Sequence, residues 1–425
     1  MPDKHAEIAK SIQSIVGSDR ITEDPGLKID GLTPKLLVRP SSAEEVVACL
    51  KVCSELDAAV IPAGRMNWLD SGNPLKRAEV VLSLDRMCRI IEYSPADLTA
   101  TVEAGLSLTE FNEMTMKQRQ WLPLDPPGFK SASLGAVAGC NSSGALRLGF
   151  GTPRDFVIGL RLAHADGTES KSGGRVVKNV AGYDLNKLYV GSYGTLAVIT
   201  ELTFKLRPLS ERSTTLMITS RYRGPLFQLA SKLLASELQP GSVILTRRLS
   251  PAGIQLPDDA LLVRFIGSEA AVEHQLSSVR ESLGEDVKTT QLTDADAKAV
   301  WSEVADFDQH SIRVRFSVPL SAVPAEFEKA LLAHLKCVAC ADIGAGIIRF
   351  GFDADERAVV AQIKKLRSNS VAAGGSLVIE KAPGEVRLKA DAWGDVGSTA
   401  PLMRSLKDKF DPQSLLNPGK FVAGI

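Results

Sequence analysis

The sequence lacks the features that mark several large classes of protein. Its 50 basic and 50 acidic residues leave no net charge, so no electrostatic attraction favours nucleic acid or an anionic membrane as a partner. No stretch approaches eighteen uncharged apolar residues, so no transmembrane segment is expected. Residues 1–20 mix charges throughout and contain no apolar run of signal-peptide length. We therefore expect a cytoplasmic protein with no nucleic-acid partner.

Cysteine and histidine are also scarce, and neither is arranged as a metal site. The six cysteines are scattered through a long chain, which predicts reduced thiols rather than a disulfide framework. C-V-A-C at Cys337 and Cys340 has the spacing of a redox pair or half of a zinc site, but no second pair accompanies it. The five histidines are never paired at ligand spacing. The cysteines are Cys49, Cys53, Cys88, Cys140, Cys337 and Cys340, and the histidines are His5, His164, His274, His310 and His334.

Two glycine- and serine-rich segments lie within apolar sequence, where a chain would otherwise fill a core. They are residues 124–144, LDPPGFKSASLGAVAGCNSSG, and residues 173–200, GGRVVKNVAGYDLNKLYVGSYGTLAVIT. Small side chains let a ligand approach the backbone, whose N–H groups can bind a diphosphate. The spacing matches neither G-x-G-x-x-G nor G-x-x-x-x-G-K-[ST], which argues against a Rossmann site and a P-loop. The segments therefore indicate a large, flat, phosphorylated cofactor bound by another fold.

Four stretches together carry a more specific pattern. They are RPSSAEEVVACLKVC from Arg39, PPGFKSASLGAVAGCNSSG from Pro126, RVVKNVAGYDLNKLYVGSYGTLAVITELTFKLRP from Arg175, and DPQSLLNPGK from Asp411. This pattern resembles the FAD-binding proteins of the vanillyl-alcohol oxidase / p-cresol methylhydroxylase (PCMH-type) family. Within that family it resembles the FAD-binding subunits of glycolate oxidases. The likeness is strong over residues 40–208 and the tail, and weak over residues 209–400.

The resemblance and the turn signals divide the chain into four parts. Residues 1–38 form an N-terminal extension, residues 39–209 a PCMH-type FAD-binding domain of two subdomains, and residues 210–400 an α+β cap. Residues 401–425 form a tail that is expected to pack on the FAD-binding domain. In the cap, two passes of strand, helix and strand predict one antiparallel sheet backed by helices. The expected fold class is therefore α+β, in a chain whose 425 residues exceed a single core.

The resemblance implies that three loops and the tail hold FAD. The first loop, PAGRMNWLDSG from Pro62, lacks the histidine through which some relatives bond the flavin, so noncovalent FAD is expected. Its alternative interpretation is an ordinary strand-to-helix turn. In the tail, Lys420 would place a positive charge near the flavin and stabilise its reduced anion. The implied cofactor-binding residues are Gly64, Arg65, Met66, Asn67, Trp68, Leu69, Pro127, Gly128, Ser133, Leu134, Gly135, Gly139, Cys140, Asn141, Ser143, Gly144, Arg154, Gly191, Gly194, Thr195, Ile199, Asn417 and Lys420.

Catalytic candidates follow from what the oxidation of a 2-hydroxy acid requires. The reaction needs a cation for the carboxylate, a base for the hydroxyl proton and the flavin as hydride acceptor. Self-sufficient relatives carry H-x-G-D-G-N-x-H and a divalent metal, whereas this chain has Asp342 and Arg349 at the ends of the matching run, so no metal is expected. Arg315 and Arg349 are candidates for the carboxylate, Asp342 for the base, and Tyr183 for the flavin or substrate pocket. The alternatives are surface ion pairs for the arginines and a core position for Tyr183.

The sequence therefore predicts an FAD-dependent oxidoreductase that acts on CH–OH groups. The favoured function is that of an FAD-binding subunit in a glycolate (2-hydroxy acid) oxidase or dehydrogenase complex. Its partners would be a catalytic flavoprotein subunit and an iron–sulfur subunit, which would also attach it to the inner membrane from the cytoplasmic side. A self-sufficient 2-hydroxy acid dehydrogenase is the first alternative, and a catalytically idle scaffold with a flavin fold is the second.

Overall fold

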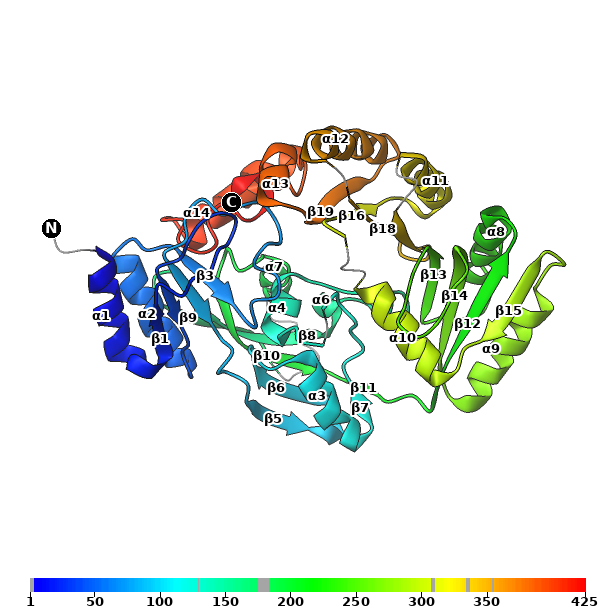
Figure 1. Cartoon of the computed structure of the whole chain (residues 1–425). Coiled ribbons are helices and arrows are strands. Elements are labelled where there is room, and N and C mark those ends of the chain that lie inside the picture. The colour runs from blue at the N-terminus through cyan, green and yellow to red at the C-terminus, as the bar shows by residue number, and fades with distance from the viewer. Residues whose placement is uncertain (1–3, 129, 175–182, 307–309, 334–336, 354) are drawn as a thin grey trace. The chain divides into compact units, whose positions relative to one another are not determined.

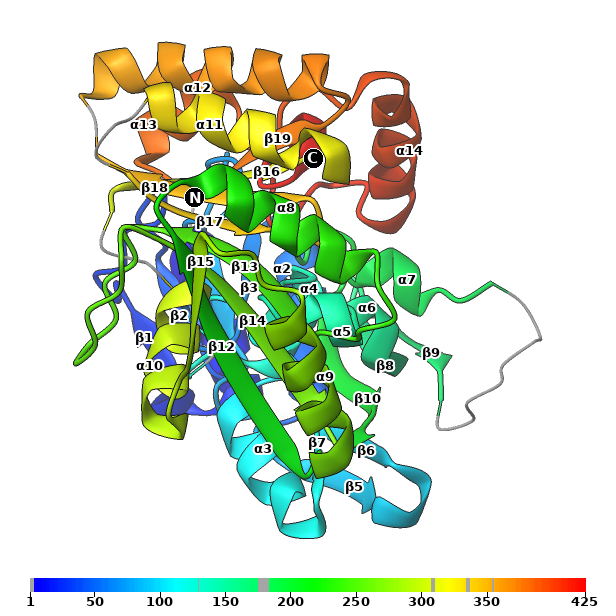
Figure 2. The ribbon, with the colours of Figure 1, turned by 90° about the vertical axis from the view of Figure 1, so that its right-hand side faces the viewer.

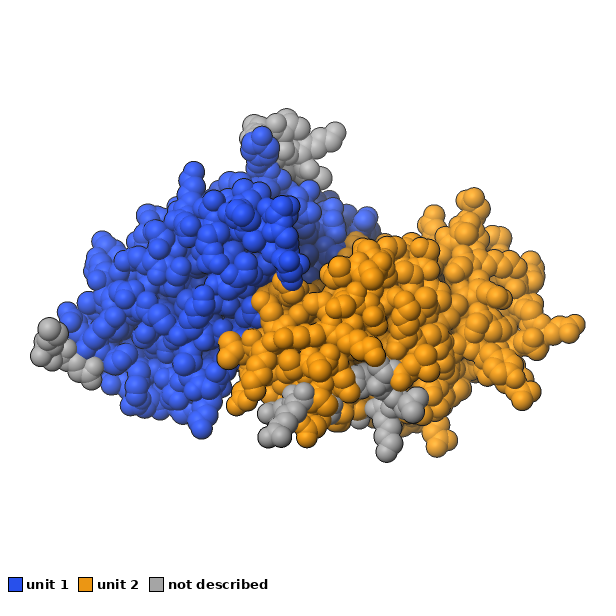
Figure 3. Space-filling model, turned by 90° about the horizontal axis from the view of Figure 1, so that it is seen from above, with its two compact units in different colours: residues 1–142, 152–208, 395–425 blue, residues 143–151, 209–394 orange. Residues whose placement is uncertain are grey.

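The computed structural model describes residues 4–128, 130–174, 183–306, 310–333, 337–353 and 355–425. It contains two compact units (Figures 1 and 3). Unit 1 comprises residues 1–142, 152–208 and 395–425, and unit 2 comprises residues 143–151 and 209–394. The chain therefore enters unit 2 twice, first for the short segment 143–151. No described helix is long and apolar enough to cross a membrane.

The first sheet of unit 1 has four strands in the order β1-β2-β4-β3. Strands β2 (Leu36–Val38), β4 (Val80–Ser83) and β3 (Val60–Ala63) are parallel, and β1 (Ile21–Glu23) is an antiparallel edge strand. Helices α1 (Lys4–Val16) and α2 (Ala43–Glu55) pack together beside it. Helix α2 starts where expected, because the Ser42 hydroxyl accepts a hydrogen bond from the Glu45 N–H at 3.3 Å.

The second sheet of unit 1 has five antiparallel strands in the order β5-β6-β10-β8-β9. These strands are β5 (Ile90–Ser94), β6 (Thr99–Glu103), β10 (Val198–Lys205), β8 (Val157–Ala163) and β9 (Glu169–Gly173). Helix α4 (Leu134–Gly139) lies against β10. The remaining elements of unit 1 are α3 (Leu108–Thr115), β7 (Gln120–Trp121), α6 (Pro153–Phe156), α7 (Asn186–Tyr189), β11 (Arg207–Pro208) and α14 (Ala400–Phe410).

The C-terminal tail lies in unit 1 and extends the first sheet at β3. Val60 N–H donates to the Leu415 carbonyl at 2.8 Å, and Asn417 N–H donates to the Val60 carbonyl at 3.0 Å. Val60 and Leu416 form a parallel bridge. Residues far apart in sequence are thus held side by side, and the tail brings Asn417 to the end of β3.

Unit 2 is built on one antiparallel sheet of eight strands, in the order β15-β12-β14-β13-β17-β18-β16-β19 (Figures 1 and 2). The strands are β12 (Arg212–Ser220), β13 (Ser242–Arg247), β14 (Asp259–Gly267), β15 (Val287–Gln291), β16 (Ile312–Ser317), β17 (Val338–Asp342), β18 (Ile347–Phe352) and β19 (Ser376–Lys381). This antiparallel sheet and the helices that accompany it confirm the predicted α+β fold class.

Alternation along each strand of unit 2 separates two apolar layers. On β13, Val243 and Leu245 belong to a large core with helices α8, α9, α11 and α12, whereas Ile244 points to the other face. There Ile244 meets Trp301 of α10, in a smaller cluster. The helices of this unit are α5 (Arg147–Phe150), α8 (Arg223–Leu234), α9 (Glu269–Glu281), α10 (Asp294–Ala305), α11 (Val323–Ala333), α12 (Glu356–Ala372) and α13 (Gly384–Ala390).

Candidate functional site

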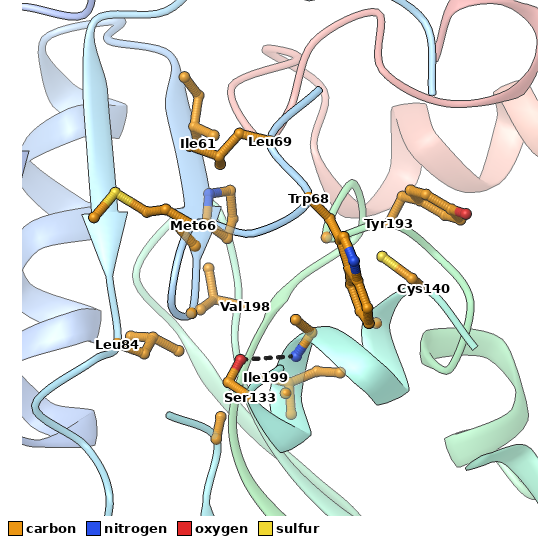
Figure 4. Close-up of a pocket in the computed structure, with 18 of the residues that line it drawn as sticks. Ile61, Met66, Trp68, Leu69, Leu84, Ser133, Cys140, Tyr193, Val198 and Ile199 are labelled. Atoms are coloured by element: carbon orange, nitrogen blue, oxygen red, sulfur yellow. Dashed lines mark hydrogen bonds between the residues drawn. The ribbon is translucent and has the colours of Figure 1, made fainter. Parts of the chain in front are cut away.

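A pocket in unit 1 gathers parts of the chain that are far apart in sequence (Figure 4). Its space is about 900 Å³, including the part open to solvent, which is within the range of small-molecule and cofactor sites. Its walls come from the end of β3 with the loop after it, from α4 with the residues before it, from the turn before β10, and from the tail. Apolar side chains such as Ile61, Leu84 and Val198 supply much of the surface. The pocket can therefore hold a large ligand with flat apolar parts.

Glycines let the walls approach one another. A Cβ on Gly64 would lie 1.9 Å from Ser133 Oγ, and a Cβ on Gly135 would lie 2.7 Å from the Ala104 Cβ. Ser133 itself caps α4, because its hydroxyl accepts a hydrogen bond from the Ala136 N–H at 3.3 Å. These two glycines thus serve the packing of the first loop and β6 against α4. Gly139 differs, since a Cβ there would meet no atom within 4 Å.

Three residues other than glycine that line the pocket have positive φ angles. Met66 has φ 60°, Tyr193 has φ 56° and Asn417 has φ 45°. Such conformations cost free energy in residues with a Cβ, and they concentrate at ligand-binding and active sites. Here they occur in three of the segments that form the walls, which is consistent with a pocket shaped for a ligand.

Asn417 presents a buried acceptor in the pocket. Its Nδ2 donates to the Tyr193 carbonyl at 2.7 Å, which joins the tail to the turn before β10. Its Oδ1 is buried and has no hydrogen-bond partner. An unsatisfied buried carbonyl costs about 1–3 kcal/mol, so a ligand that donates to Oδ1 would be favoured. The empty space at Gly139 and this acceptor fit a cofactor such as FAD, which has apolar rings and N–H donors.

Lys420 lies at the pocket but its charge is already paired. Its Nζ is 3.2 Å from Asp30 Oδ2 and also donates to the Leu69 carbonyl. These bonds fix the first loop to the tail. The sequence predicted that Lys420 places a positive charge close to the flavin. In the structure the Asp30 carboxylate lies beside this charge, and it weakens the electrostatic stabilisation that Lys420 could give a reduced flavin.

Other bonds hold the first loop in place. Arg65 Nη2 is 2.6 Å from Glu110 Oε2, and Asn67 Nδ2 donates to Ser131 Oγ at 2.8 Å. Both residues line the pocket, but these bonds connect their side chains to other parts of the protein. Their role in the structure is to set the distance between the first loop and the segment before α4.

Most of the residues expected to bind the cofactor line this one pocket. Those that line it are Gly64, Arg65, Met66, Asn67, Trp68, Leu69, Ser133, Gly135, Gly139, Cys140, Gly194, Ile199, Asn417 and Lys420. Those that do not are Pro127, Gly128, Leu134, Asn141, Ser143, Gly144, Arg154, Gly191 and Thr195. Leu134 is fully buried in the core, and the Thr195 hydroxyl donates to the Ser192 carbonyl at 2.7 Å. Ser143 and Gly144 belong to unit 2.

The sequence analysis missed a group of small and apolar lining residues. They are Ile61, Pro62, Ala63, Leu84, Ala104, Ala132, Ala136, Tyr193, Ala197 and Val198. In sequence they look like ordinary core residues of strands and a helix, so no local signal separates them from the core. Tyr193 is the exception, because its place between glycines in GSYGT marked it as part of a loop motif.

The arginine candidates lie on one face of the unit 2 sheet. Val314 and Phe316 are buried in the large core, so alternation puts Arg313 and Arg315 on the opposite face of β16. Arg349 of β18 is the register partner of Arg315. The structure therefore brings the two predicted arginines together and adds a third, Arg313.

Glu380 of β19 joins these three arginines, and the sequence analysis did not identify it. Its Oε1 is 3.1 Å from Arg315 Nε and 3.3 Å from Arg349 Nε, and its Oε2 is 3.2 Å from Arg313 Nε. Burial raises the pKa of this carboxyl, but the charges of the three arginines lower it more, so the pKa is below its ordinary value. The arginines are thus ion-paired, as the alternative interpretation held, with a partly buried carboxylate.

Asp342 ends strand β17 and is buried. Its Oδ1 accepts a hydrogen bond from the Ala345 N–H at 3.1 Å, across the turn to β18. A small cavity in unit 2 is lined by Gly144, Ala145, Arg147, Ile244, Val304, Cys340, Asp342, Ile347 and Arg349. Arg349 also donates from Nη2 to the Ser143 carbonyl at 2.9 Å. Asp342 and Arg349, two of the catalytic candidates, thus share one cavity.

Tyr183 does not occupy a core position, so that alternative was wrong. Its side chain is 97% exposed, and it is not among the residues that line the unit 1 pocket. Its neighbour Gly182, which the sequence analysis placed in the same motif, lies outside the described residues, as does His334. Among the described residues, no group of three or more His, Cys, Asp or Glu side chains is arranged to hold a metal ion.

Comparisons with known proteins agree on the cofactor. Residues 34–173 match the FAD binding domain family, and residues 245–421 match the C-terminal domain of FAD linked oxidases. The chain is 30% identical over 354 residues to glycolate oxidase subunit GlcE of Escherichia coli, covering 81% of this chain and 88% of that protein. It is 28% identical over 426 residues to glycolate oxidase subunit GlcD of Bacillus subtilis, covering 92% and 89%.

Two further relatives agree in sequence and in fold. The chain is 28% identical over 452 residues to a D-lactate dehydrogenase of Archaeoglobus fulgidus, and the match covers 98% of each protein. The crystal structure of p-cresol methylhydroxylase with substrate bound superposes with a TM-score of 0.77 at 15% identity, over 99% of this chain and 97% of that one. These findings make FAD the cofactor and confirm the resemblance found in the sequence. The chain belongs to the PCMH-type family of FAD-linked oxidoreductases, which includes oxidases and dehydrogenases of 2-hydroxy acids such as glycolate and lactate.

Proposed function

We propose that this chain is the FAD-binding subunit of a glycolate (2-hydroxy acid) oxidase or dehydrogenase complex. The observation that carries the proposal is the unit 1 pocket, where the open space at Gly139 and the unpartnered Asn417 Oδ1 fit a large cofactor with N–H donors. The cofactor would be bound without a covalent link. FAD supplies a hydride acceptor when it is bound.

Residues of unit 2 would bind and deprotonate the hydroxy acid. Arg315 and Arg349 are register partners on adjacent strands, and planar guanidinium groups bind carboxylates through two parallel hydrogen bonds. Asp342 shares a cavity with Arg349 and would accept the hydroxyl proton if this chain oxidises the acid without a partner. Tyr183, whose side chain is exposed, is the remaining candidate for contact with the substrate.

The relatives support both a subunit and a self-sufficient enzyme. GlcE and GlcD are named as subunits of glycolate oxidase, whereas the D-lactate dehydrogenase is named as an enzyme by itself. We favour the subunit, because the chain carries Asp342 and Arg349 where self-sufficient relatives were expected to carry histidine ligands. A catalytic flavoprotein subunit and an iron–sulfur subunit would then be its partners and would hold it at the membrane. An idle scaffold is favoured by no feature of the pocket.

The test is to purify the chain alone, load it with FAD and mix it anaerobically with glycolate or D-lactate. We expect a yellow protein whose flavin bleaches at least 10²-fold more slowly than in the complete complex, since a well-placed base is worth about 10²–10⁴. Bleaching at the rate of the complex would establish the self-sufficient enzyme, and a colourless protein would establish the scaffold. If the isolated chain does bleach, loss of that bleaching in Asp342→Asn would identify Asp342 as the base, with Asp286→Asn, an exposed turn residue, as the control.

A further inference from the structure

Three arginines direct the same atom, Nε, at one carboxylate. Arg313, Arg315 and Arg349 each place Nε within 3.3 Å of Glu380. Arg349 Nε donates a hydrogen bond to Glu380 Oε1, and Arg315 Nε forms an ion pair with the same oxygen. Because a guanidinium group is rigid and planar, a contact held at Nε limits the directions in which its two η nitrogens point. The four side chains come from β16, β18 and β19, which are adjacent strands of one sheet. Glu380 is therefore placed to orient Arg315 and Arg349 together, and Arg313 adds a third positive charge beside its other oxygen.

Alternation along β19 puts Glu380 on the face of the arginines, because Leu377 and Ile379 belong to the large core. Glu380 also lies at an irregularity in the pairing of β19 with β16. Val314 is opposite Ile379, and the next residue back, Arg313, is opposite Lys381. Glu380 is the extra residue of this β-bulge. Bulges redirect side chains and often occur beside active sites.

Two of the arginines also donate a hydrogen bond from an η nitrogen. Arg315 Nη1 donates to Ser317 Oγ at 2.8 Å, and Arg349 Nη2 donates to the Ser143 carbonyl at 2.9 Å. With Nε held by Glu380 and one η nitrogen held by a neutral oxygen, each of these two guanidinium groups has a defined plane. A guanidinium group whose plane is fixed is ready to form two parallel hydrogen bonds with a carboxylate.

We propose that Glu380 is a positioning residue, which holds Arg315 and Arg349 in the orientation that binds the carboxylate of a 2-hydroxy acid. The inference rests on the proposed function for the identity of the ligand, but the anion site can be tested without any flavin chemistry. Glu380 is not the base in this scheme. Its carboxylate is engaged by three guanidinium groups, which keep it ionised and weakly basic.

The test measures anion binding to the full chain by calorimetry. The probes are 2-hydroxyisobutyrate, whose α-carbon carries no hydrogen and cannot be oxidised by hydride transfer, and sulfate, a rounder anion that needs charge more than orientation. The variants are Glu380→Gln, Glu380→Asp and, as a matched control, Glu328→Gln. Glu328 also faces a guanidinium in unit 2, with its Oε2 2.6 Å from Arg223 Nη2.

We expect Glu380→Gln to weaken 2-hydroxyisobutyrate binding at least tenfold and to strengthen sulfate binding, because the variant adds positive charge while it releases the arginine planes. Glu380→Asp should restore part of the selectivity, and Glu328→Gln should leave both affinities unchanged. A general loss of structure would weaken both anions together, and that result, or no change in either, would overturn the proposal. If the wild-type chain retains FAD but binds neither anion, this inference fails while the proposed FAD-binding role stands. If the chain retains no FAD, the proposed function fails instead.

Discussion

At the scale of single residues, the glycines that line the pocket differ in the physical reason why a larger side chain is excluded. Gly64 and Gly135 are in close contact with Ser133 and Ala104, so a larger side chain at either position would disturb packing whether or not a cofactor binds. Gly194 has φ +65°, which a side chain would strain. Only Gly139 lines the pocket and faces open space without a positive φ. A larger side chain at Gly139 would therefore clash with the bound ligand while it leaves the packing of the protein unchanged.

We expect Gly139→Val to fold normally and to lose FAD affinity by about 10- to 100-fold, which corresponds to the 1–3 kcal/mol that overpacking typically costs. Flavin content after purification and the dissociation constant of FAD would measure the effect. The matched control is Gly284→Val, an exposed glycine of unit 2 that also has no neighbour within 4 Å and no positive φ. Equal flavin content in both variants would mean that the cofactor does not use this pocket.

At the scale of elements, a buried ion pair fixes the C-terminal tail. Lys407 of α14 donates from Nζ to Asp411 Oδ2 at 2.6 Å, to the Thr195 carbonyl at 2.8 Å and to the Leu416 carbonyl at 2.9 Å. Asp411 in turn accepts hydrogen bonds from the backbone of Leu415 and Leu416. Both side chains of the pair are almost fully buried. The pair therefore determines where the next residue of the tail, Asn417, enters the pocket.

Lys407→Met should destabilise the protein by about 3–5 kcal/mol, because it leaves the Asp411 carboxylate buried without its counter-ion. FAD affinity should fall as well, since the position of Asn417 depends on the same bonds. Chemical denaturation of the FAD-free and FAD-loaded forms would measure both effects. Lys409→Met, an exposed residue of the same helix, should change stability by no more than about 0.5 kcal/mol. A similarly small change in Lys407→Met would show that the ion pair does not hold the tail.

At the scale of the whole molecule, the pocket exists only when unit 1 is folded. Its lining residues range from Ile61 to Lys420, so the segments that carry them are far apart in sequence and meet through tertiary contacts. Of the described residues that line it, none is a histidine, and Cys140 is the one cysteine. Burial raises the pKa of Cys140 to about 12, so its thiolate form is scarce at neutral pH. A covalent bond to the flavin is therefore disfavoured.

Heat or acid should accordingly release intact FAD into solution and leave a colourless precipitate. Because the ligand binds only the folded chain, FAD at 100 times its dissociation constant should also raise the free energy of unfolding by about 2.7 kcal/mol. Chromatography of the supernatant and thermal unfolding with and without added FAD are the measurements. Flavin that stays on the polypeptide would contradict the prediction, and mass spectrometry of the flavin-bearing peptide would identify the attachment residue.

The pattern along the chain determined the family, the cofactor and the antiparallel sheet of unit 2. These follow from local signals. Small residues at fixed spacing mark loops such as the one before Gly139, and strict alternation marks strands such as β16. The arginines Arg315 and Arg349 were also proposed from sequence, because the resemblance places an arginine shortly before the S-V-P turn and because Arg349 ends the run that matches H-x-G-D-G-N-x-H.

Only the tertiary structure decided which residues meet. Glu380 lies beside its three arginines because β16 pairs with both β18 and β19, an order of strands that no local pattern in the sequence reveals. Lys420 likewise pairs with Asp30 across nearly the whole chain. The exposure of Tyr183 and the acceptor left on Asn417 likewise depend on packing between distant segments. Secondary structure and loop motifs are encoded by neighbours in sequence, whereas burial, charge pairing and the walls of a pocket are set by contacts that form only as the whole unit folds.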